Sequence, residues 1–162
     1  MQNIITPDLV AFLRFQFMLD WKGIHGVSHW ARVRRNGLII AKDNGADRSV
    51  IEYFSFLHDS RRFDENSDSD HGKRAAESAL SLRDSYVDLS DSAFSLLVTA
   101  CEGHTHERYH DDVTIQTCWD ADRLDLGRVG IRPDPDRMCT VKGRQLASVS
   151  EQGVMNLIKR MR

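Results

Sequence analysis

The sequence contains little cysteine, little proline and no long hydrophobic run. Its cysteines, Cys101, Cys118 and Cys139, are odd in number and widely spaced. This pattern excludes a disulfide framework and a cysteine-rich zinc site, and it is typical of a cytoplasmic protein with reduced thiols. All apolar runs are much shorter than the roughly 18 residues that a membrane-spanning helix needs. No basic region precedes an apolar stretch near the N-terminus, so a signal peptide is not expected.

Positive charge is not in excess. The chain has 22 lysines and arginines against 24 aspartates and glutamates, a formal net charge of −2, so no broad positive field attracts nucleic acid. A Gly-rich phosphate-binding loop and a Ser-His-Asp nucleophile elbow are also missing from the sequence. The 162 residues, 41% hydrophobic and 28% charged, fit a single globular domain.

The few prolines, at positions 7, 133 and 135, leave residues 8–132 free to be helical. Apolar residues recur at spacings of three and four, whereas no alternation with a period of two is long enough for a strand. Ser28 and Ser90 are predicted N-caps, and Asn44-Gly45 is expected to end the second helix. The prediction is an all-α domain with a helix that starts at Pro7, a polar loop over 64–70, and further helices at about 28–42, 47–57, 70–83, 90–102, 112–126 and 148–160.

An adjacent imidazole and carboxylate, His58-Asp59, follow the apolar run of the third expected helix. Such a pair at the junction of a helix and a polar loop can bind one divalent metal ion, but mixed nitrogen and oxygen ligands do not identify the metal. His29 lies upstream, and Asp120 and Asp122 lie downstream. Asp122 shares the apolar face of its expected helix, and Asp120 lies about 200° round that helix. The geometry therefore favours Asp122 as a further ligand, with Asp120 as the alternative.

The order His, His-Asp, Asp resembles the signature of the HD-domain metal-dependent phosphohydrolases. Arg32-Val33 follows the first histidine and two arginines follow the His-Asp pair, as is common in that family. The segment Ala121-Asp122-Arg123-Leu124 is similar to the Ala-Asp-x-Leu that carries the family's last aspartate. The resemblance runs from about residue 29 to residue 128. It implies a single HD-type helical domain over residues 1–162, with the motif-bearing core at about 23–130 and an internal metal site.

The resemblance also implies the ligands and the cofactor. His29, His58, Asp59 and Asp122 would bind one ion. Some family members bind two, and the segments around His71 and His104 resemble the elements that supply the extra histidines. These two histidines are expected to bind a second ion. The alternatives are that they belong to the outer shell of a single metal ion or that they contact the substrate phosphate. The cofactor is then one or two divalent transition-metal ions: manganese, iron, cobalt, nickel or zinc.

The activity that the resemblance implies is hydrolysis of a phosphomonoester or phosphodiester, of a nucleotide in particular, by a metal-activated water. Asp59, Glu65 and Asp120 are candidate bases, and His25 is expected to line the site. Arg61 and Arg62 are the first candidates to hold the phosphate, because a guanidinium matches two phosphate oxygens. Other basic residues close to ligand positions are Arg32, Lys73, Arg123 and Arg128. The alternatives are a catalytically idle HD-fold protein that senses a nucleotide, and a helical interaction protein with structural zinc, which the absence of cysteine from the cluster disfavours.

Overall fold

The structure is a computed structural model that describes residues 3–149. Within this range the chain is all-helical without a strand, which confirms the predicted fold class. No helix of the described range has both the length and the apolar character to cross a membrane. The α-helices and the two short 3-10 helices, η1 and η2, are α1 (Pro7–Gln16), α2 (Val27–Ala41), α3 (Arg48–Leu57), α4 (His71–Leu82), α5 (Asp91–Gly103), α6 (Val113–Arg123), η1 (Leu126–Val129), η2 (Pro135–Arg137) and α7 (Val141–Ala147).

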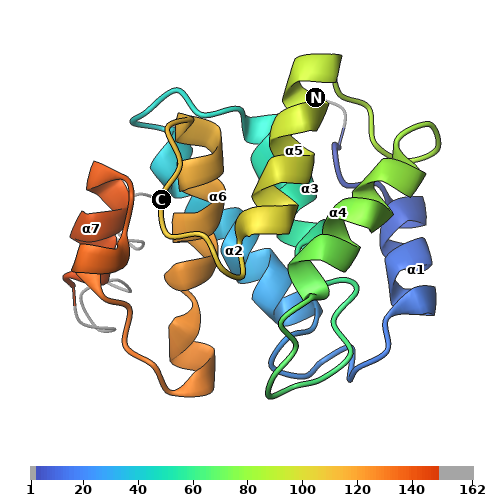
Figure 1. Ribbon diagram of the computed structural model, residues 1–162, viewed down its shortest axis with the longest axis horizontal. Coiled ribbons are helices and arrows are strands. Elements are labelled where there is room, and N and C mark those ends of the chain that lie inside the picture. Colours follow the sequence, from blue (N-terminus) through green and yellow to red (C-terminus); the bar gives the residue numbers. More distant parts are fainter. Residues whose placement is uncertain (1–2, 150–162) are drawn as a thin grey trace.

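Helix α3 lies at the centre of the fold because it packs against α2, α4, α5 and α6. Every residue from Val50 to Leu57 is buried, and the one charged side chain among them, Glu52, forms an ion pair with Arg34 at 2.7 Å. Helix α2 approaches α3 closely at Gly37, where an added Cβ would lie 2.5 Å from Ile51 Cγ2. Helices α1 and α7 lie at opposite ends of the molecule (Figure 1). The His-Asp pair that follows α3 is thereby placed deep in the bundle.

The helix starts depend on capping side chains in most cases. Ser90 accepts a hydrogen bond from the Ala93 N–H, as predicted, and Asp47 and Asp112 cap α3 and α6 in the same way. The prediction for Ser28 is wrong, since Gly26 is the N-cap of α2 and makes no side-chain bond. The reason is steric: a Cβ at Gly26 would lie 2.2 Å from the Trp21 carbonyl oxygen. The chain can therefore turn into the helix only at a glycine.

The C-terminal part of the sequence prediction needs correction. Helix α6 ends at Arg123, three residues before the predicted end at about 126, and the short helix η1 follows it. The short helix α7 was not predicted, because its seven residues carry too little apolar periodicity to be recognised. Ser148 and Val149 follow it as a turn and a bend. The remainder of the helix expected at 148–160 lies outside the described residues.

Candidate metal centre

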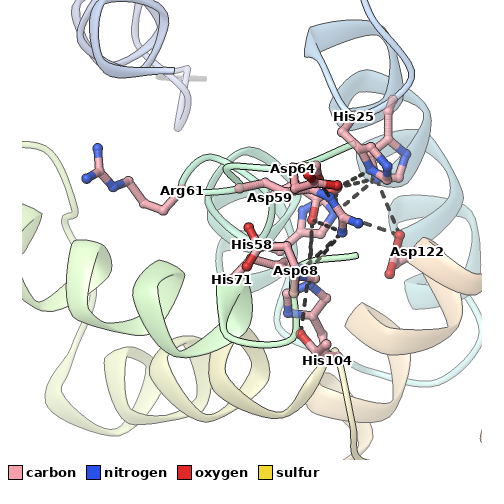
Figure 2. Close-up of polar contacts among 12 residues, drawn as sticks. His25, His58, Asp59, Arg61, Asp64, Asp68, His71, His104 and Asp122 are labelled. Carbon is pink, nitrogen blue, oxygen red and sulfur yellow. Dashed lines mark hydrogen bonds and ion pairs between the residues drawn. The ribbon is translucent and has the colours of Figure 1, made fainter. Parts of the chain in front are cut away.

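The predicted ligands come together at the C-terminal end of α3, and helices α2 to α6 all contribute to the group (Figure 2). His29 projects from α2, and His58 and Asp59 directly follow α3. His71 begins α4, His104 follows the last residue of α5, and Asp122 lies in the last turn of α6. Within residues 3–149, two sets of side chains have ligand atoms within 4.8 Å of one another: His29, His58 and Asp59, and Asp59, His71 and His104.

The first set surrounds the Nε2 atoms of two buried histidines. His29 Nε2 lies 3.0 Å from His58 Nε2. Asp122 Oδ1 is 3.4 Å from the former and 3.7 Å from the latter, and Asp59 Oδ2 is at 3.5 and 3.8 Å. Both histidines are fully buried, and the Asp122 side chain is 17% exposed. Two imidazole nitrogens and two carboxylate oxygens thus converge, which is a donor set that divalent transition metals accept.

Hydrogen bonds to the other ring nitrogens determine which atoms of these histidines are available. His29 Nδ1 donates to Asp125 Oδ2 at 2.7 Å, and His58 Nδ1 donates to the Phe54 carbonyl oxygen at 3.2 Å. Each Nε2 therefore directs a lone pair toward the other. Two lone pairs at this separation repel unless a proton or a metal cation lies between them. Among the described residues, Asp122 Oδ1 is also buried without a hydrogen-bond partner. The residues therefore fit a bound metal ion.

Burial and the neighbouring charges together determine the pKa values of the first set. Burial opposes a charge on His29, but the nearby carboxylates of Asp122, Asp125 and Asp59 outweigh it and raise the pKa to about 10. Burial lowers the pKa of His58 to about 3, against the attraction of the two nearby carboxylates. Burial also opposes the charge on Asp122, yet His29, His58 and Arg128 hold its pKa well below the usual range. In the metal-free set the carboxylates are therefore charged, and a positive charge on His29 balances part of their negative charge.

The second set repeats this arrangement on the other oxygen of Asp59. Asp59 Oδ1 lies 3.2 Å from His71 Nε2 and 3.7 Å from His104 Nε2, and these two nitrogens are 2.9 Å apart. His104 Nδ1 donates to the Cys101 carbonyl oxygen at 2.7 Å, and His71 Nδ1 donates to the Asp68 carbonyl oxygen. Two lone pairs again face each other beside a carboxylate. Asp59 consequently has one oxygen in each set and could bridge two ions.

A further layer of side chains orients the ligands. His25, expected to line the site, contacts Asp59 Oδ2 through Nδ1 at 3.1 Å. Asp125 holds His29 and accepts two hydrogen bonds from Arg32, at 2.7 and 3.0 Å. The sequence reading missed this role for Asp125, although its position three residues after Asp122, one helical turn away, was an available signal. Such outer partners fix the ring orientation of metal-binding histidines.

The acidic loop between α3 and α4 forms one wall of the site through its backbone. The carbonyl oxygen of Asp64 accepts from Arg62 Nε at 2.8 Å, and that of Glu65 contacts His25 Nε2 at 3.2 Å. Glu65 Oε2 is 3.8 Å from His25 Nε2 and has no hydrogen-bond partner among the described residues. The loop thus contacts His25 and Arg62, which both lie beside Asp59. Glu65 is the candidate base in this loop.

The candidate phosphate-binding arginines lie in different places. Arg61 points away from the ligands (Figure 2) and donates to Gln16 at 3.1 Å, with its guanidinium over Phe63. Arg62 faces inward, with Nη1 4.0 Å from Asp59 Oδ1. Arg128 Nη2 is 3.8 Å from Asp122 Oδ1. The structure therefore brings Arg62 and Arg128 to the ligands and leaves Arg61 outside.

Asp120, the alternative to Asp122, is buried in another environment. Its carboxylate accepts hydrogen bonds from the Cys139 N–H at 2.8 Å and from the Thr140 N–H and hydroxyl, both at 2.7 Å. These contacts connect α6 to the start of α7, at the opposite side of α6 from the ligand set. Asp122 is the aspartate of α6 that meets His29 and His58.

Comparison with known proteins identifies the fold. No protein-family model and no curated protein matches the sequence. The structure is similar to that of an HD-superfamily hydrolase from an uncultured Thermotogales bacterium, with 24% identity over 95% of this chain and 89% of that one and a TM-score of 0.72. It is also similar to an HD-superfamily hydrolase from Bacillus thuringiensis, with 17% identity over 83% and 82% of the two chains and a TM-score of 0.52.

Proposed function

Since the chain has the fold of the HD-superfamily hydrolases, we propose that it is a metal-dependent phosphohydrolase. The observation that supports this most is the position of Asp59, whose two oxygens face two pairs of histidine nitrogens. A purely structural zinc site would be closed by four ligands and would usually contain cysteine. The described cysteines are absent from both sets.

The metal ligands are proposed as follows. His29, His58, Asp59 and Asp122 would hold the first ion, and Asp59, His71 and His104 would hold the second. When bound, a divalent ion lowers the pKa of a coordinated water and polarises a phosphoryl oxygen. The mixed ligands suit manganese, iron, cobalt, nickel or zinc.

The surrounding residues have separate tasks. His25 holds Asp59 in the orientation in which each of its oxygens faces one histidine pair. Glu65 Oε2, beside His25 Nε2, is available to accept a proton from an attacking water, whereas Asp120 is engaged by the start of α7. Arg62, next to Asp59 Oδ1, adds positive charge where a phosphoryl group would gain negative charge. The substrate is proposed to be a small phosphorylated compound, a nucleotide in particular.

Metal analysis followed by a phosphate-release screen tests the proposal. The purified protein should contain one or two transition-metal ions and should release phosphate from phosphomonoesters or cleave phosphodiesters when manganese, cobalt or nickel is supplied. The Asp59→Asn protein should remain folded and lose both metal and activity, because Asp59 belongs to both sets. Asp84, on the surface, gives a matched control: Asp84→Asn should behave as the wild type.

The outcomes separate the competing functions. Wild-type metal content and activity in the Asp59→Asn protein would refute the proposed centre. A protein that binds metal and nucleotide but cleaves none of the phosphoesters would instead be the idle HD-fold sensor. Metal that cannot be removed without unfolding, together with no nucleotide binding, would indicate structural zinc.

A further inference from the structure

Unpaired buried polar atoms are concentrated around the ligand sets. Among the described residues, four buried side-chain atoms lack a hydrogen-bond partner: Gln16 Nε2, Glu65 Oε2, Asp122 Oδ1 and Arg128 Nε. Asp122 and Arg128 are neighbours, with Arg128 Nη2 3.8 Å from Asp122 Oδ1, and Glu65 is next to His25. Buried polar atoms are nearly always paired, so each exception needs an explanation. A metal ion explains the unpaired oxygen of Asp122, but it cannot explain an unpaired N–H donor.

Arg128 is held in place by one edge of its guanidinium. It lies in η1, and its Nη1 donates to the Asp125 carbonyl oxygen at 3.1 Å. The side chain is 9% exposed. The other edge, formed by Nε and Nη2, is not hydrogen-bonded to Asp122, since 3.8 Å exceeds hydrogen-bond length. Two parallel N–H donors of this kind match two oxygens of one phosphate group.

The other arginines near ligand positions use this edge elsewhere or lie outside the site. Arg32 donates through Nε and Nη2 to Asp125, and Arg62 donates through Nε to the Asp64 carbonyl oxygen. Arg123 donates to the carbonyl oxygens of Glu107, Arg108 and Arg137. Arg61 lies outside the ligand group (Figure 2). Arg128 therefore combines a buried position beside a ligand with an unpaired Nε.

The charge of Arg128 also needs an explanation. A guanidinium beside Asp122 repels a divalent ion bound to that carboxylate, so its position weakens metal binding. An anion that contacts both the ion and the guanidinium would remove this repulsion. The position of the Arg128 guanidinium is therefore favourable when an anion binds beside the metal ion.

We propose that Arg128 binds two oxygens of the substrate's phosphate through Nε and Nη2, beside the first ligand set. This inference rests on the proposed function and assigns its two-oxygen phosphate contact to a residue of η1, in addition to the positive charge that Arg62 supplies. The structural alternative is that Arg128 only neutralises Asp122 and ties η1 to α6. Phosphate affinity and metal affinity distinguish the two roles.

The test uses inorganic phosphate as the probe and calorimetric titration of the manganese-loaded protein. Arg128→Met keeps the length of the side chain and removes the donors, so phosphate binding should weaken about tenfold or more, the loss of one charge-assisted bidentate contact. Manganese should bind no more weakly than in the wild type. Arg128→Lys retains the charge but not the two parallel donors and should be intermediate. Arg61→Met is the matched control and should bind phosphate normally.

Each other result overturns the inference. Unchanged phosphate affinity in the Arg128→Met protein would do so, as would a wild type that binds no phosphate. The structural role would be indicated if Arg128→Met lowered the affinity for manganese and Arg128→Lys restored the affinities for both manganese and phosphate. If Arg128→Met does not fold, wild-type phosphate affinity in Arg128→Lys overturns the inference. Binding is measured without turnover, so a protein that binds phosphate through Arg128 and hydrolyses nothing contradicts only the proposed function.

Discussion

The same substitution at the two aspartates of α6 should affect two different properties of the protein. Asp120→Asn and Asp122→Asn each remove one negative charge with almost no change in volume. Asp120 accepts three hydrogen bonds from Cys139 and Thr140, whereas Asp122 Oδ1 accepts none among the described residues and faces the Nε2 atoms of two histidines. Asp120→Asn should therefore reduce stability, and Asp122→Asn should reduce metal binding.

The magnitude follows from the contacts of Asp120. Its Oδ2 accepts both bonds from Thr140, and its Oδ1 accepts the bond from the Cys139 N–H. An asparagine can retain one oxygen, so its amide group must face at least one N–H donor. Loss of a buried hydrogen bond to a charged group costs about 1.5–3 kcal/mol. With weaker bonds at the retained oxygen, we expect Asp120→Asn to lower the free energy of unfolding by about 3 kcal/mol, a fall in Tm of about 6–12 °C for a domain of this size.

The assay compares thermal unfolding in the presence of a chelator with metal content measured after reloading. The chelator is needed because bound metal stabilises the folded state and would otherwise hide the comparison. Asp120→Asn should unfold early but reload to the wild-type metal content below its Tm. Asp122→Asn should have the higher Tm of the two variants and retain little metal. The reverse pattern, with metal lost from Asp120→Asn and retained by Asp122→Asn, would refute the orientation of α6 described here.

Three further predictions concern the second ligand set, its backbone and the pH dependence. If both sets bind metal, His71→Ala should lower the saturating stoichiometry from two ions to one, as measured by elemental analysis; a wild-type stoichiometry of one would contradict this. Gly72→Ala should destabilise the protein by about 1–3 kcal/mol, because its Cβ would lie 2.8 Å from the Glu102 carbonyl oxygen. It should also lower the amount of metal bound by the second set. Unchanged thermal unfolding would argue against this packing. In chelator, the free energy of unfolding should fall as pH rises from about 6.5 to about 10, because the folded-state pKa of His29 is raised from 6.5 to about 10 and the stabilising proton is lost across that window; a His29→Gln protein should lack this slope, and a wild type that lacks it too would show that His29 is not protonated.

The helices were predictable because their signals are local. Apolar spacing, the Ser90 cap and the turn at Gly45, which has a φ of 74°, all act within a few residues of one another. The Ser28 cap was predicted on the same basis, and it failed because the deciding contact is between Gly26 and Trp21, where the backbone itself packs closely. Helix α7 was missed because its seven residues carry too little apolar periodicity, and its start also depends on contacts with Asp120 from another helix.

The candidate site likewise has features that the local sequence predicts and features that it does not. The order of His29, His58-Asp59 and Asp122 in the sequence was sufficient to nominate ligands, because a family signature is a linear pattern; their role in metal binding stays a prediction. The sequence also favoured Asp122 over Asp120, since helical periodicity determines which residues share a face. It could not determine which charged side chains meet those ligands.

Those contacts depend on how the helices pack. Asp125 holds His29 across 96 residues of sequence, and His25 reaches Asp59 only because the segment before α2 lies against the end of α3. Arg61 and Arg62 are neighbours in sequence, yet one points outward and the other inward. Arg128 lies at the ligands because α6 ends at Arg123 and the short helix η1 that follows brings its Nη2 within 3.8 Å of Asp122 Oδ1. Local sequence determines the type and the face of each helix, whereas the angles between helices and the side-chain rotamers are determined by the packing of the whole core.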